Sequence, residues 1–189
     1  MKSIEIELST RCVIKCPACP RTKSPGQIQE RPINNWNVGF LDKELVFKLF
    51  HEYYGIYNFC GAYGDPIYHP DIIEIIQKLI KHKKVFNIET NGSKKSSEFW
   101  YEIADNDWDK PNQGFTFSID GLEDTNHIYR KNSDWKRIKC SIFISVNKTT
   151  WINITISSHK SHVIIFTFWN YFFHSIFHLS SSDSKYKGL

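Results

Sequence analysis

The sequence Arg-Cys-Val-Ile-Lys-Cys-Pro-Ala-Cys-Pro-Arg (residues 11–21) contains three of the five cysteines of this 189-residue chain. Cys12, Cys16 and Cys19 follow the spacing C-x3-C-x2-C. Thiolates this close together in one loop can point inward and hold three irons of a four-iron cubane. The fourth iron then has no protein thiolate and is open to a small chelating molecule. The spacing therefore favours an iron–sulfur site with one open corner.

A zinc site is the alternative interpretation of three close cysteines, with Cys60, Cys140 or a histidine as the fourth ligand. Zinc sites usually combine two C-x2-C pairs some distance apart, and no second pair occurs in this sequence. A disulfide framework would suit a small secreted domain. The segment Met1–Glu7, however, carries acidic residues where a secretory signal is apolar. We therefore expect reduced thiols and a cytoplasmic location, and zinc stays open as an alternative.

Four short apolar segments predict β-strands, at residues 4–8, 56–60, 85–89 and 115–119. Helical patterns separate them, so the order is strand, loop and helix, repeated. Such an order implies parallel strands with right-handed crossovers, and the expected fold class is α/β. The net charge of +4 is mild and indicates no nucleic-acid partner.

The loops that follow three of these strands carry polar and glycine-rich motifs. They are Tyr-Gly-Asp-Pro at 63–66, Glu-Thr-Asn-Gly at 89–92 and Ser-Ile-Asp-Gly at 118–121, with Arg130 downstream. Each motif alone is an ordinary turn. Because the carboxyl ends of parallel strands meet at one rim, we expect these loops and the cysteine loop to surround one ligand.

Taken together, the cysteine spacing and the three loop motifs resemble the radical S-adenosylmethionine (SAM) superfamily over roughly the first 139 residues. The resemblance implies a partial (βα) barrel with about four parallel βα units. It also implies a [4Fe-4S] cluster on Cys12, Cys16 and Cys19, with S-adenosyl-L-methionine on the open iron. The implied reaction is reductive SAM cleavage, after which a 5′-deoxyadenosyl radical abstracts hydrogen from an unknown substrate. A flavodoxin- or ferredoxin-like reductant is the implied electron donor.

Site residues follow from the same resemblance. Tyr-Gly-Asp-Pro is similar to the family's G-G-E-P motif, so Tyr63, Gly64 and Asp65 would position the methionine end of SAM, with Asp65 balancing its ammonium charge. Tyr63 replaces the first glycine, and Asp65 replaces the glutamate. Asn91 would lie near the ribose or the substrate. In the last motif, Ser118 and Asp120 would make polar contacts to SAM. Arg130, downstream of it, would contact the SAM carboxylate.

The composition changes after Lys139. Of the 20 acidic residues, 19 precede residue 140, and the remainder of the chain is rich in Ser, Phe and Ile. The glycine-rich pattern that the family uses in a fifth βα unit does not occur there. Residues 142–146 and 151–156 alternate like strands. The aromatic run at 163–173 is too short and too interrupted for a membrane span.

We therefore expect two parts: a partial radical SAM core at 1–139 and an atypical aromatic and Ser-rich tail at 140–189. The tail is expected to be frame-shifted or disordered, or alternatively a divergent β-rich extension. In either case we expect no regular fifth and sixth βα units. A catalytically inactive radical SAM fragment is then the second alternative, beside the zinc-stabilised binding module.

Overall fold

The architecture is that of a computed structural model. It describes residues 1–19, 22–24, 27–30, 39–109, 112–148, 152–157 and 163–168. The strands are β1 (Ser3–Ile6), β2 (Thr22–Ser24), β3 (Gln27–Glu30), β4 (Ile56–Phe59), β5 (Val85–Thr90), β6 (Gln113–Ile119), β7 (Ile152–Ser157) and β8 (Val163–Phe168). The helices are α1 (Lys43–Glu52), the 3-10 turn η1 (Pro66–Tyr68), α2 (Ile72–Lys81), α3 (Ser97–Ala104), α4 (Asn126–Tyr129) and α5 (Trp135–Lys148).

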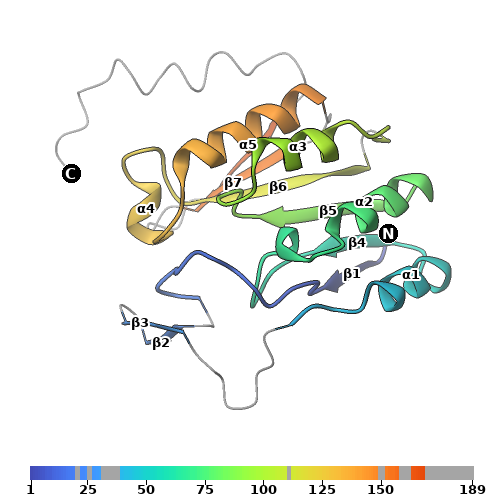
Figure 1. Cartoon of the computed structure of the whole chain (residues 1–189), viewed down its shortest axis with the longest axis horizontal. Coiled ribbons are helices and arrows are strands. Elements are labelled where there is room, and N and C mark those ends of the chain that lie inside the picture. Colours follow the sequence, from blue (N-terminus) through green and yellow to red (C-terminus); the bar gives the residue numbers. More distant parts are fainter. Residues whose placement is uncertain are drawn as a thin grey trace.

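A six-stranded sheet in the order β1-β4-β5-β6-β7-β8 organises the fold. The first five strands pair in parallel, and β8 runs antiparallel to β7. Strands β2 and β3 form a separate antiparallel pair. All four predicted strand segments are confirmed as parallel neighbours, and the predicted α/β partial barrel is confirmed with them. In Figure 1 the cysteine loop and α4 lie at the end of the sheet where the parallel strands finish.

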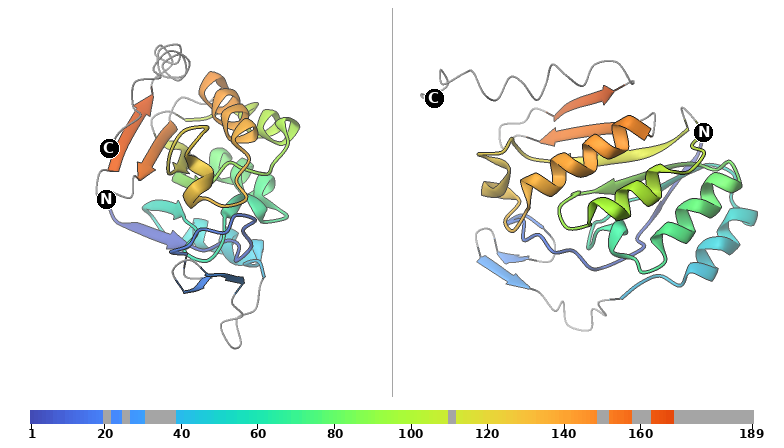
Figure 2. Two further views of the ribbon diagram at one scale, coloured as in Figure 1. Left: turned by 90° about the vertical axis from the view of Figure 1, so that its left-hand side faces the viewer. Right: turned by 45° about the horizontal axis from the view of Figure 1, so that its top comes forward.

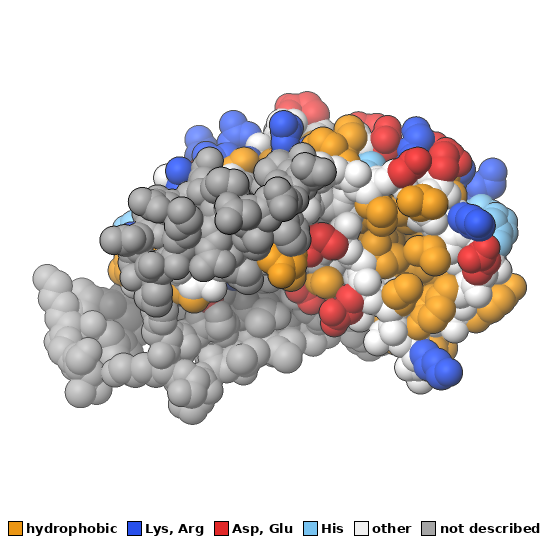
Figure 3. Space-filling model, turned by 90° about the horizontal axis from the view of Figure 1, so that it is seen from below, with side chains coloured by type: hydrophobic (Ala, Val, Ile, Leu, Met, Phe, Trp, Pro, Cys, Tyr) orange, Lys and Arg blue, Asp and Glu red, His pale blue; other side chains and the backbone are white. Residues whose placement is uncertain are grey.

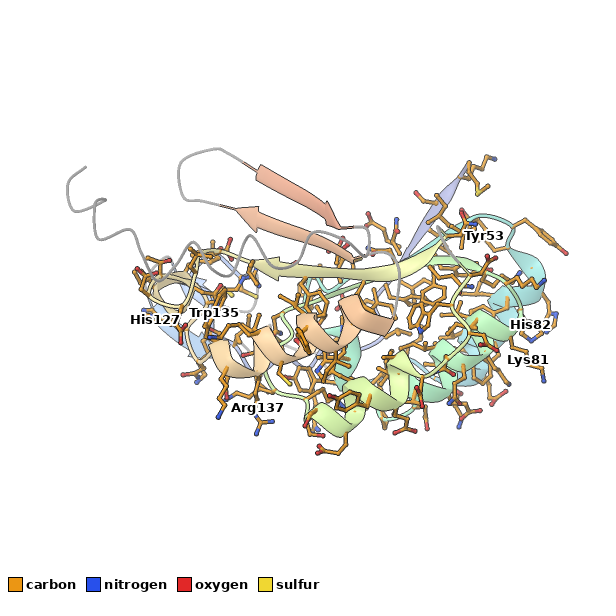
Figure 4. The ribbon with its side chains drawn as sticks, turned by 90° about the horizontal axis from the view of Figure 1, so that it is seen from above. Tyr53, Lys81, His82, His127, Trp135 and Arg137 are labelled. Atoms are coloured by element: carbon orange, nitrogen blue, oxygen red, sulfur yellow. The ribbon has the colours of Figure 1, made fainter. Side chains whose placement is uncertain are left out.

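The helices cover one face of the sheet. Figures 2 and 4 show α1, α2, α3 and α5 side by side on the same side of the strands. The alternation of side chains explains this arrangement: in β5 the buried Phe86 and Ile88 alternate with Asn87 and Glu89, which are more exposed. The apolar face therefore packs against the helices, and the opposite face is polar.

Aromatic rings form much of the core beneath α3. The ring of Trp100, which is 1% exposed, lies 5.5 Å from Phe115 and 5.5 Å from Phe117, measured between ring centroids. Edge-to-face and tilted contacts at this distance add to the free energy of apolar burial. This packing fixes α3 on β6 and thereby fixes the loop that precedes α3.

The segment after Lys139 corrects one expectation. Residues 142–146 were predicted as a strand but belong to α5, which continues unbroken through residue 139. The buried positions Ile138, Ser141, Ile142 and Ser145 recur at helical spacing. Small serines fill two of these positions, so a pattern that counts apolar residues alone misses the helix.

A fifth parallel strand is present, because β7 pairs with β6 over Phe115↔Ile152 to Ile119↔Ile156. The predicted strand at 151–156 therefore corresponds to β7. The next strand, β8, is antiparallel and so forms no further βα unit. Positions 149–151, 158–162 and 169–189 of the expected tail lie outside the described residues. None of the helices in the described ranges is long and apolar enough to cross a membrane.

The aromatic core predicts a sharp difference between two adjacent residues of α3. Replacing buried Trp100 by alanine should lower the free energy of unfolding by about 3–5 kcal/mol, because it leaves a cavity between α3 and β6. Replacing Tyr101, which is 54% exposed, should change it by less than about 0.5 kcal/mol. Urea unfolding followed by circular dichroism measures both variants. Equal losses would contradict this packing.

Candidate functional site

A pocket of about 160 Å³ lies at the carboxyl ends of the parallel strands. Its walls come from the cysteine loop, from the loop after β4, from the end of β5, and from β6 and the segment after α4. The lining residues are Cys12, Ile14, Cys16, Cys19, Gly61, Ala62, Tyr63, Gly64, Asp65, Glu89, Thr90, Asn91, Ser118 and Arg130.

Nine of the ten site residues predicted from sequence line this pocket. Their roles as ligands of a cluster or of SAM remain predictions, although their convergence on one rim is a property of the fold. The tenth, Asp120, lies behind Arg130 and forms an ion pair with it. The sequence prediction missed Glu89 and Thr90, which also line the pocket. The polar alternation of β5 was the signal that could have found Glu89.

The cysteine loop is held by backbone contacts. Ile14, which is 3% exposed, anchors the loop in the interior. The Lys15 amide donates to the Lys131 carbonyl at 2.9 Å, and the Cys19 amide donates to the Cys16 carbonyl at 3.1 Å. These bonds leave Cys12, Cys16 and Cys19 half-buried in the pocket wall as reduced thiols. Within the described ranges, no three His, Cys, Asp or Glu side chains are grouped as ligands of a single metal ion.

The loop after β4 lies directly against the start of the cysteine loop. A Cβ atom on Gly64 would stand 1.8 Å from the carbonyl oxygen of Ser9, so only glycine permits this approach. The next amide, that of Asp65, donates to the Arg11 carbonyl at 2.8 Å. From the other side the Glu7 carboxylate accepts a hydrogen bond from the Ala62 amide at 3.0 Å. The two loops therefore form one unit.

Asp65 is 3% exposed and accepts hydrogen bonds at both carboxylate oxygens. One oxygen accepts from the Ile67 amide at 3.2 Å. The other accepts from the Thr90 hydroxyl at 3.0 Å, from the Asn91 amide at 2.9 Å and from the Asn91 side chain. Burial raises the pKa of Asp65 to about 6, although these hydrogen bonds and the charge of Arg130 act to lower the pKa.

The turn after β5 is fixed by α5. Gly92 has φ +65°, a conformation that favours glycine, and its carbonyl accepts from the Ser141 hydroxyl at 3.3 Å. The Ser93 hydroxyl accepts from the Asp134 amide at 2.5 Å. The predicted division at residue 139 thus falls inside α5, whose Ser141 holds this turn.

Among the described residues that line the pocket, Arg130 is the cationic one. Its Nε lies 2.5 Å from Asp120 Oδ2, and the two side chains are 16% and 4% exposed. The Asp120 amide donates to the Asn126 side chain at 2.9 Å, which fixes Asp120 against α4. This geometry orients the guanidinium toward the pocket, where its planar fork of N–H donors suits a carboxylate.

The polar face of the sheet carries an acidic group next to the pocket. Partial removal from solvent and the neighbouring Glu5 raise the pKa of Glu89. Partial burial, followed by Glu5, Glu89 and Glu7, raises the pKa of the Cys60 thiol. Cys60 is therefore a poor thiolate donor compared with an unperturbed cysteine. Figure 3 shows acidic side chains grouped beside hydrophobic ones on the surface seen from below.

Within the described ranges, the histidines and the basic helix ends do not belong to the pocket lining. In Figure 4, Lys81 and His82 lie at the end of the molecule opposite His127 and α4. His69 is buried; its Nε2 lies 2.7 Å from the Leu41 carbonyl, and its Nδ1 accepts from the Asp71 amide at 3.1 Å. His69 therefore holds the chain before α1 against the start of α2.

The fold and site together define a partial (βα) barrel with a three-cysteine loop and one polar pocket at its strand ends. The sequence profile of the Radical SAM superfamily matches residues 6–156. This chain belongs to the radical SAM superfamily, whose cofactors are a [4Fe-4S] cluster and SAM. No curated protein matches the chain.

Solved structures share the fold. SuiB from Streptococcus suis bound to S-adenosylmethionine has 16% identity and a TM-score of 0.56, covering 82% of this chain and 33% of SuiB. The anSMEcpe structure with bound AdoMet has 18% identity and a TM-score of 0.58, covering 82% of this chain and 42% of anSMEcpe. The chain thus spans between a third and about two fifths of the length of these matched proteins.

The buried carboxyl of Asp65 predicts a pH dependence of stability in the apoprotein. Its pKa is about 6 in the folded state against an ordinary 3.8, so between these values the folded state binds more protons than the unfolded state. Stability contributed by Asp65 should therefore fall as the pH rises from about 4 to about 6, by roughly 3 kcal/mol in total.

Asp65→Asn removes this titration and should flatten the pH dependence over that window, whatever constant offset the substitution introduces. Urea unfolding of the wild-type and variant apoproteins at several pH values measures the difference in slope. Parallel pH profiles would contradict the raised pKa of Asp65.

Proposed function

We propose that this chain is the core of a radical SAM enzyme that binds a [4Fe-4S] cluster through Cys12, Cys16 and Cys19. The observation that carries the proposal is the convergence of these thiols with Asp65 and Arg130 on one pocket. When bound, the cluster and SAM supply an electron and a cleavable carbon–sulfur bond, giving a 5′-deoxyadenosyl radical that abstracts hydrogen from an unidentified substrate.

Arg130 binds the SAM carboxylate in this proposal. A carboxylate leaving water needs a charged donor, and the guanidinium offers N–H groups beyond the Nε that faces Asp120. Asp120 acts through Arg130, because the ion pair between them keeps the Arg130 guanidinium oriented. Ser118, at the end of β6, provides a further polar contact on the same wall.

The ammonium group of SAM requires a nearby carboxylate or carbonyl once it is desolvated. Asp65 contributes its charge, but both of its oxygens already accept protein hydrogen bonds. We therefore assign the direct contacts to backbone carbonyls of the loop that contains Tyr63 and Gly64. Glu89 adds a second negative charge to the pocket wall.

The substrate approaches from the polar face of the sheet in this proposal, since α1, α2, α3 and α5 cover the apolar face. Thr116 donates to the Asn87 side chain at 2.9 Å on that polar face, next to Glu89. SuiB has been solved with the precursor peptide SuiA, and anSMEcpe with the Cp18Cys peptide. For this chain we propose a substrate partner without naming its class, and a flavodoxin- or ferredoxin-like reductant in a reducing, cytoplasmic setting.

A second candidate function is a cofactor-binding fragment that does not turn over. The chain spans 33% of SuiB and 42% of anSMEcpe, and among the described strands the fifth parallel strand, β7, is followed by antiparallel β8 rather than by a further βα unit. A radical intermediate is useful only where the protein excludes solvent around it. Cluster binding without substrate-coupled cleavage is the outcome that supports this candidate.

The cysteine set predicts which substitutions abolish the cluster. After anaerobic reconstitution, Cys12→Ala, Cys16→Ala and Cys19→Ala should each lose the four-iron cluster, because a site with one open iron has no spare thiolate. Cys60→Ala and Cys140→Ala are the matched controls and should retain it. Iron and sulfide analysis, with absorbance near 400 nm, measures the loading.

Two results would overturn the assignment. Loss of the cluster in Cys60→Ala would indicate four thiolate ligands and leave no open iron for SAM. A colourless protein that holds a single zinc would instead support the zinc-stabilised module. For a protein that loads the cluster, release of 5′-deoxyadenosine from SAM under a strong reductant then distinguishes the enzyme from the inactive fragment.

A further inference from the structure

The side chain of Asn91 is buried, with 4% exposure, and each of its polar atoms has a protein partner. Its Oδ1 accepts from the Ser93 amide at 3.0 Å. Its Nδ2 donates to the carboxylate of Asp65 and to Sγ of Cys12, the latter at 3.5 Å. A carboxylate accepts and a backbone amide donates, so the two ends of the side-chain amide cannot exchange places.

The partners of Asn91 are themselves fixed. The Asp65 carboxylate accepts a hydrogen bond from the backbone amide of Asn91. The backbone amide of Asp65 donates to the Arg11 carbonyl. Arg11 directly precedes Cys12 in the chain. Hydrogen bonds therefore connect Asn91, Asp65 and the Arg11–Cys12 segment in a ring. In this ring the side-chain N–H of Asn91 has little freedom to turn away from the Cys12 sulfur.

We propose that Asn91 is a positioning residue for the cluster, whose side-chain N–H donates to the Cys12 thiolate and raises the reduction potential of the bound centre. This inference rests on the proposed function, because it requires Cys12 to be an iron ligand. The expectation that Asn91 lies near the ribose or the substrate stays a prediction, and the hydrogen bonds of its side chain add a role toward Cys12.

The physical reason is charge. Reduction adds one negative charge, and part of that charge resides on the ligand sulfurs. A hydrogen bond to a ligand sulfur stabilises the more negative state and so shifts the potential upward. The effect is large where the donor is buried and cannot be replaced by water. Asn91 meets this condition.

The test compares Asn91→Ala with Thr90→Val in reconstituted holoprotein. The alanine variant removes the donor to Cys12 but leaves Asp65 with hydrogen bonds from Thr90, Ile67 and the residue 91 backbone. The valine variant is the matched control, because it removes the hydrogen bond from the Thr90 hydroxyl to Asp65 and the one that this hydroxyl accepts from the Gly92 amide, and leaves the contact to Cys12. A purely structural role of the network would affect both variants alike.

Midpoint potentials are measured by electron paramagnetic resonance (EPR) during redox titration without SAM. Asn91→Ala should have a more negative potential, with a reduced-to-oxidised ratio up to roughly tenfold lower at a fixed poise. For one electron this corresponds to about 59 mV. Thr90→Val should titrate like the wild type. Equal potentials in wild type and Asn91→Ala, with the cluster loaded in both, would overturn the inference.

Iron analysis distinguishes a failure of the proposed function from a failure of the role proposed for Asn91. A wild type that binds no iron–sulfur cluster overturns the proposed function, and this inference with it. If Asn91→Ala does not load the cluster, pulsed EPR of reduced wild-type holoprotein with 15N in its asparagine side chains decides the matter. A nitrogen coupling to the cluster is expected, and its absence overturns the role of Asn91.

Discussion

The contact between Gly64 and the backbone at Ser9 is the constraint on which the rest of the site depends. It brings the loop after β4 against the first residues of the cysteine loop, where no side chain fits between them. The hydrogen bond from the Asp65 amide to the Arg11 carbonyl then sets the register of the two loops. With that register fixed, the carboxylate of Asp65 can reach Thr90 at the end of β5 and Asn91 directly after it. Three strand ends are thereby joined through one buried acid.

The two faces of the sheet differ in polarity and in what they contact. Aromatic and branched side chains on one face pack beneath the helices and supply most of the apolar burial, with Trp100 at the centre. The other face keeps Asn87, Glu89 and Thr116 in polar surroundings. Strand alternation alone produces this division. The packed apolar face makes the sheet a rigid support for the pocket at its strand ends. The polar face leaves the opposite side of the sheet open to solvent.

Much of the fold could be predicted from the sequence, because β-strand alternation and loop motifs are local. The parallel strands and the placement of Gly64 and Arg130 at one rim are examples. The helix through Ser141 could not be recognised, since small polar residues occupy its buried face. The engagement of Asn91 was also hidden. Its partners Cys12 and Asp65 are 79 and 26 residues away in the chain, and only the folded structure shows that they meet.

The bond between the Lys15 amide and the Lys131 carbonyl has a consequence for biosynthesis. The cysteine loop leaves the ribosome before the partner that fixes it, which follows about 116 residues later. At ordinary translation speeds of about 5–20 residues per second the delay is roughly 6–23 s. During that interval the thiols of Cys12, Cys16 and Cys19 lie close together in the chain, but the other residues that line the pocket are not yet all in place. The thiols must therefore stay reduced throughout this interval if they are to ligate iron in the folded chain.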